Sequence, residues 1–168
     1  MNIFIVLLFF IFSFNLRAQD NVNIDEVRVY KSNHRMDMLV HGKVVKSYHV
    51  MLGRGGKAPK RKEGDNLVPE GQYILDYKNF NSLFYKSIHV SYPNDEDLRR
   101  ASEAGVEPGG DIMIHGYPNN PTPFFKFLKR VGLVRLVNWT AGCISVDDRE
   151  MEEIFNNIEV PIPINIFH

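Results

Sequence analysis

Short runs with β-strand character, separated by turn residues, constrain the fold of this chain more than any other feature. Along Val44–Leu52 successive side chains alternate between two faces, the pattern of a strand in a sheet. Pro161 and Pro163 alternate in the last such run, and because proline cannot donate a ladder hydrogen bond, that run is predicted at a sheet edge. The predicted strands are Val27–Tyr30, Met36–Val40, Val44–Leu52, Gln72–Asp76, Ser82–Tyr92, Asp111–Ile114 and Val160–Phe167.

Helix-start signals occur at three places between or after these strands. Asn94 precedes an acidic-to-basic segment that ends at Gly105, and we expect a surface helix there with no chemistry. Thr122-Pro123 is a cap followed by a first-turn proline, which predicts a helix over Phe124–Val131. Asp147-Asp148-Arg149-Glu150 is a capping box for a third helix. The sequence thus predicts a mainly β fold with a few peripheral helices.

The N-terminus has the pattern of a secretory signal peptide. Ile3–Phe12 is apolar throughout, but a bilayer span needs about 20 residues, so no stable transmembrane span is expected. With Ala18 as a cleavage point, residues 1–18 are predicted as a signal peptide and residues 22–168 as one domain, secreted to the periplasm or cell envelope. Because no cation precedes the run and Leu16 occupies a small-residue position, an uncleaved anchor is the alternative.

The charge balance excludes a general attraction to polyanions. Lys plus Arg and Asp plus Glu both total 20, so we expect no nucleic-acid partner. The glycine-rich loop 53–71 nevertheless concentrates cations, and it does not match a phosphate-binding loop, because Ala58 follows Gly56-Lys57. The cations are Arg54, Lys57, Lys60, Arg61 and Lys62. Either they form a solvated face or they contact the carboxylates of an acidic substrate.

The single cysteine, Cys143, is the first candidate for chemistry. It has no partner for an intramolecular disulfide, and it follows Gly142 in a stretch where the backbone is expected to turn tightly. A free cysteine is often just a small buried hydrophobe. Read instead as a nucleophile, it needs a base, since a thiol of ordinary pKa is mostly protonated at neutral pH. The N–H groups of Gly142 and Cys143 would then be candidates for binding an oxyanion.

His115 is the best-placed base. It ends the apolar strand Asp111–Ile114 and is followed by Gly116, so its side chain is expected at the rim of the sheet, although a purely structural histidine is the plainer interpretation. A zinc hydrolase that uses Cys143, His115 and His89 is a remote alternative, because no histidine pair has zinc-ligand spacing. We therefore expect no metal and no cofactor.

Several segments together resemble the YkuD-type L,D-transpeptidase catalytic domain. Ile114-His115-Gly116 followed by Thr140-Ala141-Gly142-Cys143-Ile144-Ser145 is similar to the family's His-Gly and Ser/Thr-His-Gly-Cys motifs, in the branch with Trp-Thr-Ala-Gly-Cys. Further segments match in the same order along most of the chain: Leu52-Gly53, Lys60–Asp65, Pro69–Tyr73, Ser87–Pro93 and Gly109–Gly116.

The resemblance implies an L,D-transpeptidase-like β-sandwich or barrel that acts on peptidoglycan stem peptides and, in this branch, on protein linked to the wall. It implies that Cys143 is the nucleophile, that His115 is the general base, and that the carbonyl of Gly116 orients the imidazole. It implies no cofactor. The candidate residues for the oxyanion or the substrate are Gly142, Thr140, Arg61 and Tyr92.

Departures from the family pattern leave the acyl acceptor open. Ala141 stands where many members have a second histidine, and Ser145 stands where many have arginine. The spacer after Gly116 is longer than usual because of the predicted helix Phe124–Val131, which we expect to roof the cleft. An amine acceptor would make the protein a transpeptidase and water would make it a hydrolase, while an inert wall-binding module is the non-enzymatic alternative.

Overall fold

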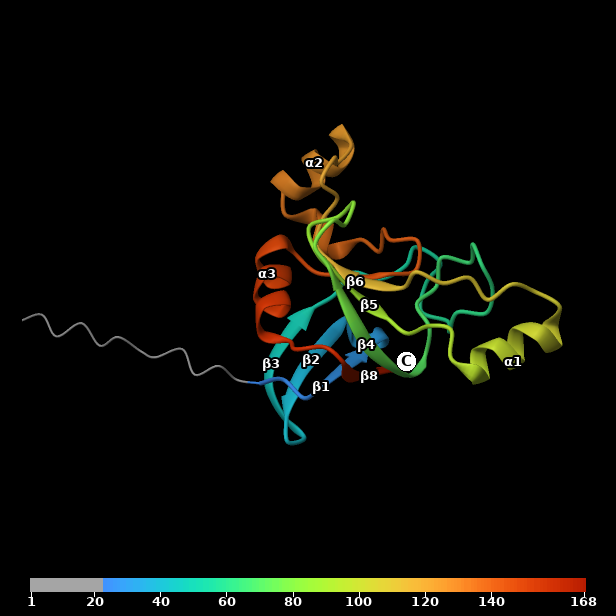
Figure 1. The fold of residues 1–168 in the computed structure, drawn as a ribbon. Helices are drawn as coiled ribbons and strands as arrows, with labels where there is room; N and C mark the ends of the chain where they lie inside the picture. The colour runs from blue at the N-terminus through green and yellow to red at the C-terminus, as the bar shows by residue number, and fades with distance from the viewer. Residues whose placement is uncertain (1–22) are drawn as a thin grey trace, which may run out of the picture.

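One curled sheet of eight strands forms the body of the molecule (Figure 1). The structure, a computed structural model, describes residues 23–168, so the predicted signal peptide 1–18 lies outside the described residues. The strand order is β3-β2-β1-β8-β4-β5-β6-β7, which confirms the predicted mainly β fold. The strands are β1 Glu26–Tyr30, β2 Arg35–Val40, β3 Lys43–His49, β4 Gly71–Asn79, β5 Ser87–Val90, β6 Met113–His115, β7 Ile144–Ser145 and β8 Ile162–Phe167.

The two edges of the sheet meet, which curls it toward a barrel. Met51, two residues beyond β3, exchanges two backbone hydrogen bonds of 2.8 Å with Ser145 of β7. The expected strand Val44–Leu52 therefore ends at His49, because the residues after it leave β2 and cross to β7. This closure brings the segment after β3 against the stretch that contains the cysteine.

The position of β8 corrects the prediction of an edge strand. β8 lies between β1, to which it is parallel, and β4, to which it is antiparallel. Pro163 faces Ile74, whose N–H and carbonyl both bond to Ser91, and the pairing with β1 begins only at Ile164. Neither neighbouring strand needs an N–H from Pro163, so the proline is tolerated inside the sheet.

Strand β5 is shorter than the predicted run Ser82–Tyr92. Lys86 has a left-handed backbone with φ of 47°, which interrupts the strand just before Ser87. The residues before it form a loop in which the backbone of Phe84 makes an isolated antiparallel β-bridge with Pro118. This loop brings Phe84 close to the end of β6.

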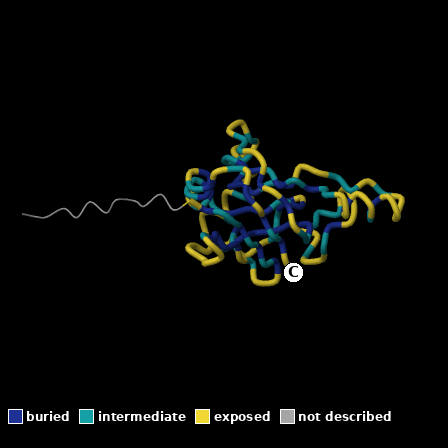
Figure 2. Tube along the Cα trace, turned by 60° about the horizontal axis from the view of Figure 1, so that its bottom comes forward, coloured by how far each residue is buried: buried dark blue, intermediate teal, exposed yellow. Residues whose placement is uncertain are grey.

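The helices begin where their caps predict. They are α1 Asp95–Ala104, α2 Pro123–Arg130 and α3 Asp148–Asn157, and short 3-10 turns lie at η1 Lys31–Asn33 and η2 Leu133–Leu136. Asn94, Thr122 and Asp147 each accept a hydrogen bond from the backbone of the first turn. The apolar stripe of α3 consists of Met151, Ile154 and Phe155, which pack into the main hydrophobic core. This core is the dark-blue interior of Figure 2.

The segment from Thr122 to Val137, which we call the insert, contains α2 and η2 and stands clear of the sheet (Figure 1). It is anchored by Phe125 and Leu128, which pack on a small cluster that includes Tyr117 and Trp139. α1 projects from the right-hand side of the molecule in the same view, away from α2 at the top. In the part of the chain that is described, no helix combines the length and the apolar character that crossing a bilayer requires.

Candidate active site

The neighbouring parallel strands β6 and β7 set the relation between His115 and Cys143. His115 is opposite Ser145 in the register, and Ile114 is opposite Ile144. Both isoleucines are fully buried on the core face. Because side chains alternate along a strand, His115 and Ser145 share the other face, and Cys143 directly precedes β7, the strand beside His115.

The imidazole of His115 is buried, held in place and neutral. Its Nδ1 lies 2.6 Å from the carbonyl oxygen of Gly116, and since a carbonyl only accepts, Nδ1 carries the proton and Nε2 carries a lone pair. The ring stacks on Phe84 at 4.1 Å between centroids and meets Trp139 edge-on at 5.6 Å. Burial lowers the pKa of His115 to about 4. At neutral pH the ring is therefore a base without a charge.

The thiol of Cys143 is half-buried and protonated. It donates to the carbonyl oxygen of Asp111 over 3.5 Å, and it makes no hydrogen bond to His115 in this structure. Burial raises the pKa of the Cys143 thiol, while the backbone N–H of Met113 and the charge of Lys60 act in the opposite direction. The thiol therefore needs a base to become a nucleophile.

Thr140 and Gly142 shape the turn that presents Cys143. The hydroxyl of Thr140 donates to the Cys143 carbonyl at 2.6 Å and accepts from the Gly142 N–H at 3.2 Å. Gly142 has φ of +126°, and a side chain there would come within 2.9 Å of the Leu67 carbonyl oxygen. The Gly142 N–H, expected to bind an oxyanion, is thus used inside the turn, and Thr140 is directed at the backbone.

Two buried lysines are bonded to groups of loop 53–71 and stabilise its shape. Lys31 Nζ bonds to the carbonyls of Ala58 and Val68, and Lys60 Nζ lies 2.9 Å from the carboxylate of Asp65. Both ammonium groups are almost fully shielded from solvent. The expectation that Lys60 belongs to an exposed cation cluster is therefore wrong, because its charge is compensated inside the loop. Arg54, Lys57, Arg61 and Lys62 are exposed.

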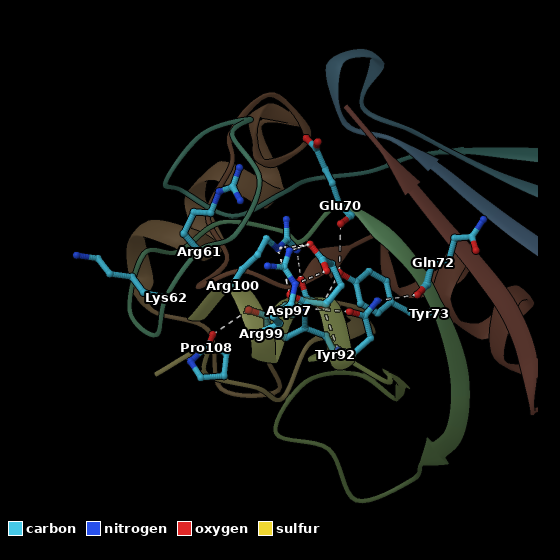
Figure 3. Close-up of polar contacts among 12 residues, drawn as sticks. Arg61, Lys62, Glu70, Gln72, Tyr73, Tyr92, Asp97, Arg99, Arg100 and Pro108 are labelled. Carbon is cyan, nitrogen blue, oxygen red and sulfur yellow. Dashed lines mark hydrogen bonds and ion pairs between the residues drawn. The ribbon is translucent and has the colours of Figure 1, made fainter. Parts of the chain in front are cut away.

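Arg61 and Tyr92 lie together in a cavity of about 480 Å³ beside α1. Figure 3 shows Tyr92 directed toward Pro108, whose carbonyl accepts from the Tyr92 hydroxyl at 2.9 Å, while Arg61 and Lys62 extend from the loop. The lining also includes Asp97 and Arg100 of α1, but neither Cys143 nor His115. The structure thus groups the two candidate substrate residues with each other and not with the thiol.

Histidines outside the pair have structural partners. His89, the third ligand of the zinc alternative, has Nδ1 2.7 Å from the carboxylate of Asp76 and stacks on Tyr77. Among residues 23–168, no group of three or more His, Cys, Asp or Glu side chains is arranged to hold a metal ion.

The sequence analysis did not identify the aromatic walls of the site or the partner of the thiol. Phe84, from the loop before β5, and Trp139, two residues beyond the insert, flank His115. Asp111, with φ of 54°, directs its carbonyl at the thiol. Trp139 adjoins the cysteine motif and carried a usable signal, whereas the contact of Phe84 depends on the loop geometry.

The family model for the L,D-transpeptidase catalytic domain, YkuD, matches residues 24–166. The chain belongs to this family. Among curated sequences, the "Putative L,D-transpeptidase YafK" of Escherichia coli (strain K12) is 29% identical over 96 residues, which is 54% of this chain and 37% of YafK. The chain thus spans little more than a third of that relative.

Solved structures show the same fold at low sequence identity. The helical cell shape determining protein Pgp2 of Campylobacter jejuni, as its K307A mutant, has a TM-score of 0.60 at 23% identity, covering 86% of this chain and 47% of Pgp2. Bd1075 of Bdellovibrio bacteriovorus has a TM-score of 0.59 at 20% identity over 87% of this chain and 48% of its own. The LD transpeptidase LdtMt1, solved in complex with imipenem, has a TM-score of 0.51 at 15% identity, over 85% of this chain and 58% of its own. These matches confirm the L,D-transpeptidase-like fold.

Proposed function

We propose that this chain is a cysteine-dependent acyltransferase of peptidoglycan stem peptides, an L,D-transpeptidase, secreted to the cell envelope. One observation carries the proposal: a neutral His115, fixed by the Gly116 carbonyl, ends a strand that is paired with the strand directly after the chain's only thiol. Family membership over residues 24–166 supports the same chemistry.

The reaction begins with the transfer of the Cys143 proton to Nε2 of His115. For this, the thiol turns from the Asp111 carbonyl by rotation about its Cα–Cβ bond, since hydrogen bonds between catalytic groups often form only with substrate. Sulfur attacks the carbonyl carbon at the L-centre of the diaminopimelate-type residue, and the carbonyl π electrons move to oxygen. When the tetrahedral intermediate collapses, the C–N bond breaks and D-alanine leaves with the proton from His115, so a thioester remains on Cys143.

In the second half of the reaction, an amine of a neighbouring stem attacks the thioester. His115 takes the amine proton and returns it to the leaving sulfur, which regenerates the thiol and forms the cross-link. Burial keeps the imidazole in its proton-accepting form at neutral pH but weakens it as a base, so each proton transfer depends on the negative charge that develops beside the ring and stabilises the imidazolium.

Hydrolysis of the same thioester is the second candidate. Cys143 is half-buried rather than enclosed, and its neighbour Ala141 is exposed, so water has access to this side of the turn. With water as acceptor the protein would act as an L,D-carboxypeptidase, or as an amidase that releases protein from the wall.

The test is to incubate the full chain with tetrapeptide muropeptides and to separate the products by mass spectrometry. Cross-linked dimers indicate transpeptidation, tripeptides indicate carboxypeptidase activity, and release of protein from isolated wall indicates the amidase. Cys143→Ser should lower every product by several orders of magnitude with an unchanged melting temperature. Products that form equally in this variant would show that Cys143 is not the nucleophile, and a lack of products from both proteins would leave only the wall-binding module.

A further inference from the structure

The insert displays apolar side chains that the rest of the described molecule leaves uncovered. None of the residues of α2 is buried, although five of its eight residues are apolar or aromatic. Phe124, Phe127 and Leu136 are 69%, 57% and 78% exposed. Val131, Leu133 and Val137 are also exposed. Large side chains of this kind, gathered on one projection, are characteristic of a contact surface.

The apolar residues of α2 face two directions, and only one of them is used within the chain. Phe125 and Leu128 face the small cluster around Tyr117 and Trp139. Phe124, Phe127 and Val131 follow the i, i+3, i+7 spacing, so they form a second stripe along the helix. Because this stripe is exposed, roughly half of the apolar surface of the helix has no partner in the fold.

The charge of the insert is of one sign. Residues 122–137 contain Lys126, Lys129, Arg130 and Arg135 and no acidic residue, in a chain whose overall charge is zero. Lys129 and Arg135 form ion pairs with the acids at the start of α3 and fasten the insert to the body. Lys126 and Arg130 are exposed and form no ion pair with a residue of the described chain. They are therefore free to bind an anionic partner.

We propose that the insert docks on the surface of an anionic phospholipid bilayer. Phe124 and Phe127 enter the boundary between headgroups and acyl chains, and Lys126 and Arg130 contact the phosphates. A helix with aromatic residues on one side and Lys and Arg on the other is the type that lies in a bilayer interface. The shape favours lipid over a folded protein, because α2 stands out from the body (Figure 1). The cavity of about 450 Å³ at the base of the insert is lined by Lys129, Arg135 and acids at the start of α3, and neither Phe124 nor Phe127 lines it.

Docking would place the candidate active site at the edge of the bilayer. Phe125 of α2 contacts Trp139 at 5.0 Å between ring centroids, and Trp139 in turn meets His115. Two ring contacts thus connect α2 with the imidazole of His115. The proposal concerns the insert alone and does not depend on the reaction that the site catalyses.

The test measures the binding of the full chain to vesicles of phosphatidylcholine alone and of phosphatidylcholine with phosphatidylglycerol. Hydrogen exchange locates the contact, so that binding through the apolar N-terminal segment is distinguished from binding through the insert. We expect slower exchange over residues 122–137 only with anionic vesicles, and weaker binding at high salt. Lys126→Glu combined with Arg130→Glu should lower partition at least about 25-fold, since each cation near the surface contributes about fivefold.

A second variant and a matched control separate docking from a general loss of apolar surface. Phe124→Ser combined with Phe127→Ser should lower partition by about tenfold for each ring removed from the interface. Val44→Ser combined with Val45→Ser removes exposed side chains from the β2–β3 hairpin and should leave partition unchanged. Unchanged exchange over the insert, equal binding by all variants, or a lipid-independent dimer that the phenylalanine variant dissociates would each overturn the proposal.

Discussion

The sheet and the insert use similar apolar residues in opposite ways. In the sheet, Val27, Ile114 and Ile144 are completely removed from solvent, and the main core is continuous from β1 to α3. In the insert, phenylalanines of larger apolar area remain mostly exposed. The contrast shows that hydrophobicity alone does not determine burial: the sheet closes on itself through β7, whereas α2 has a structural partner on only one side.

The candidate active site lies on the border between these two regions. The backbone partners of His115 and Cys143 are Gly116, directly after β6, and Asp111, shortly before it, while Trp139, one wall of the imidazole, packs against Phe125 of the insert. Substitutions in the sheet should therefore lower catalytic activity much more than substitutions in the insert.

The largest effect should follow from the loss of the base on the sheet. We expect His115→Gln to lower kcat for muropeptide conversion by about 10²- to 10⁴-fold, the usual contribution of a general base. His89→Gln, on the neighbouring strand β5, is the matched control and should retain activity because its partner is Asp76. Equal losses in the two variants would show that the effect is on the sheet and not on catalysis.

The buried imidazole should also make stability depend on pH. The folded-state pKa of about 4 lies below the ordinary value of 6.5, so the unfolded chain binds a proton at His115 in this window and the folded chain does not. The free energy of unfolding should therefore fall by about 3 kcal/mol as the pH drops from 6.5 to 4. Denaturant titrations at several pH values measure how the free energy of unfolding changes with pH. The contribution of His115 to this change should be absent from His115→Gln.

A smaller effect is expected at the turn that carries the cysteine. Gly142→Ala places a methyl group against the Leu67 carbonyl in a left-handed conformation, which should cost about 1–3 kcal/mol of stability and reduce activity as Cys143 shifts. Gly56→Ala measures the cost of the positive φ alone, without a steric clash, because Gly56 has φ of +105° and nothing within 4 Å of an added methyl group. The prediction fails if both variants lose the same stability, measured by denaturant unfolding.

The smallest effect should separate the two sides of the insert. Phe125→Ala removes the ring that packs on Tyr117 and Trp139, and should destabilise the protein by about 1–2 kcal/mol. Phe124→Ala, one residue away but 69% exposed, should change stability by less than about 0.5 kcal/mol. Thermal unfolding of the two variants provides the comparison, and a reversed order would mean that the insert packs through its other side.

Local signals in the sequence predict elements well where the reason for them is local. The caps Asn94, Thr122 and Asp147 start the three helices as expected, because a cap depends only on its own first turn. The central position of β8 was missed, because it depends on Ser91 satisfying the backbone of Ile74, a contact between distant segments. The expectation of an edge strand assumed that every residue of an interior strand must donate a backbone hydrogen bond to a neighbouring strand.

In the candidate active site too, features with a local cause were predicted and features that depend on distant contacts were not. The motif and its spacing single out His115 and Cys143, and the pairing of β6 with β7 brings the segments that carry them side by side. The burial of Lys60 was not predictable, because it requires Asp65 and the carbonyl of Lys62 to fold around the ammonium group. The wall formed by Phe84 likewise depends on where the β4–β5 loop folds back.

Acylation by a carbapenem tests the central claim, that Cys143 is the nucleophile, most directly. The full chain is incubated with imipenem, and its intact mass and peptide map are compared with those of Cys143→Ser and His115→Gln. We predict one adduct per chain, located on Cys143, absent from Cys143→Ser and formed much more slowly in His115→Gln. An adduct on another residue, or no adduct on the native protein, would contradict the claim.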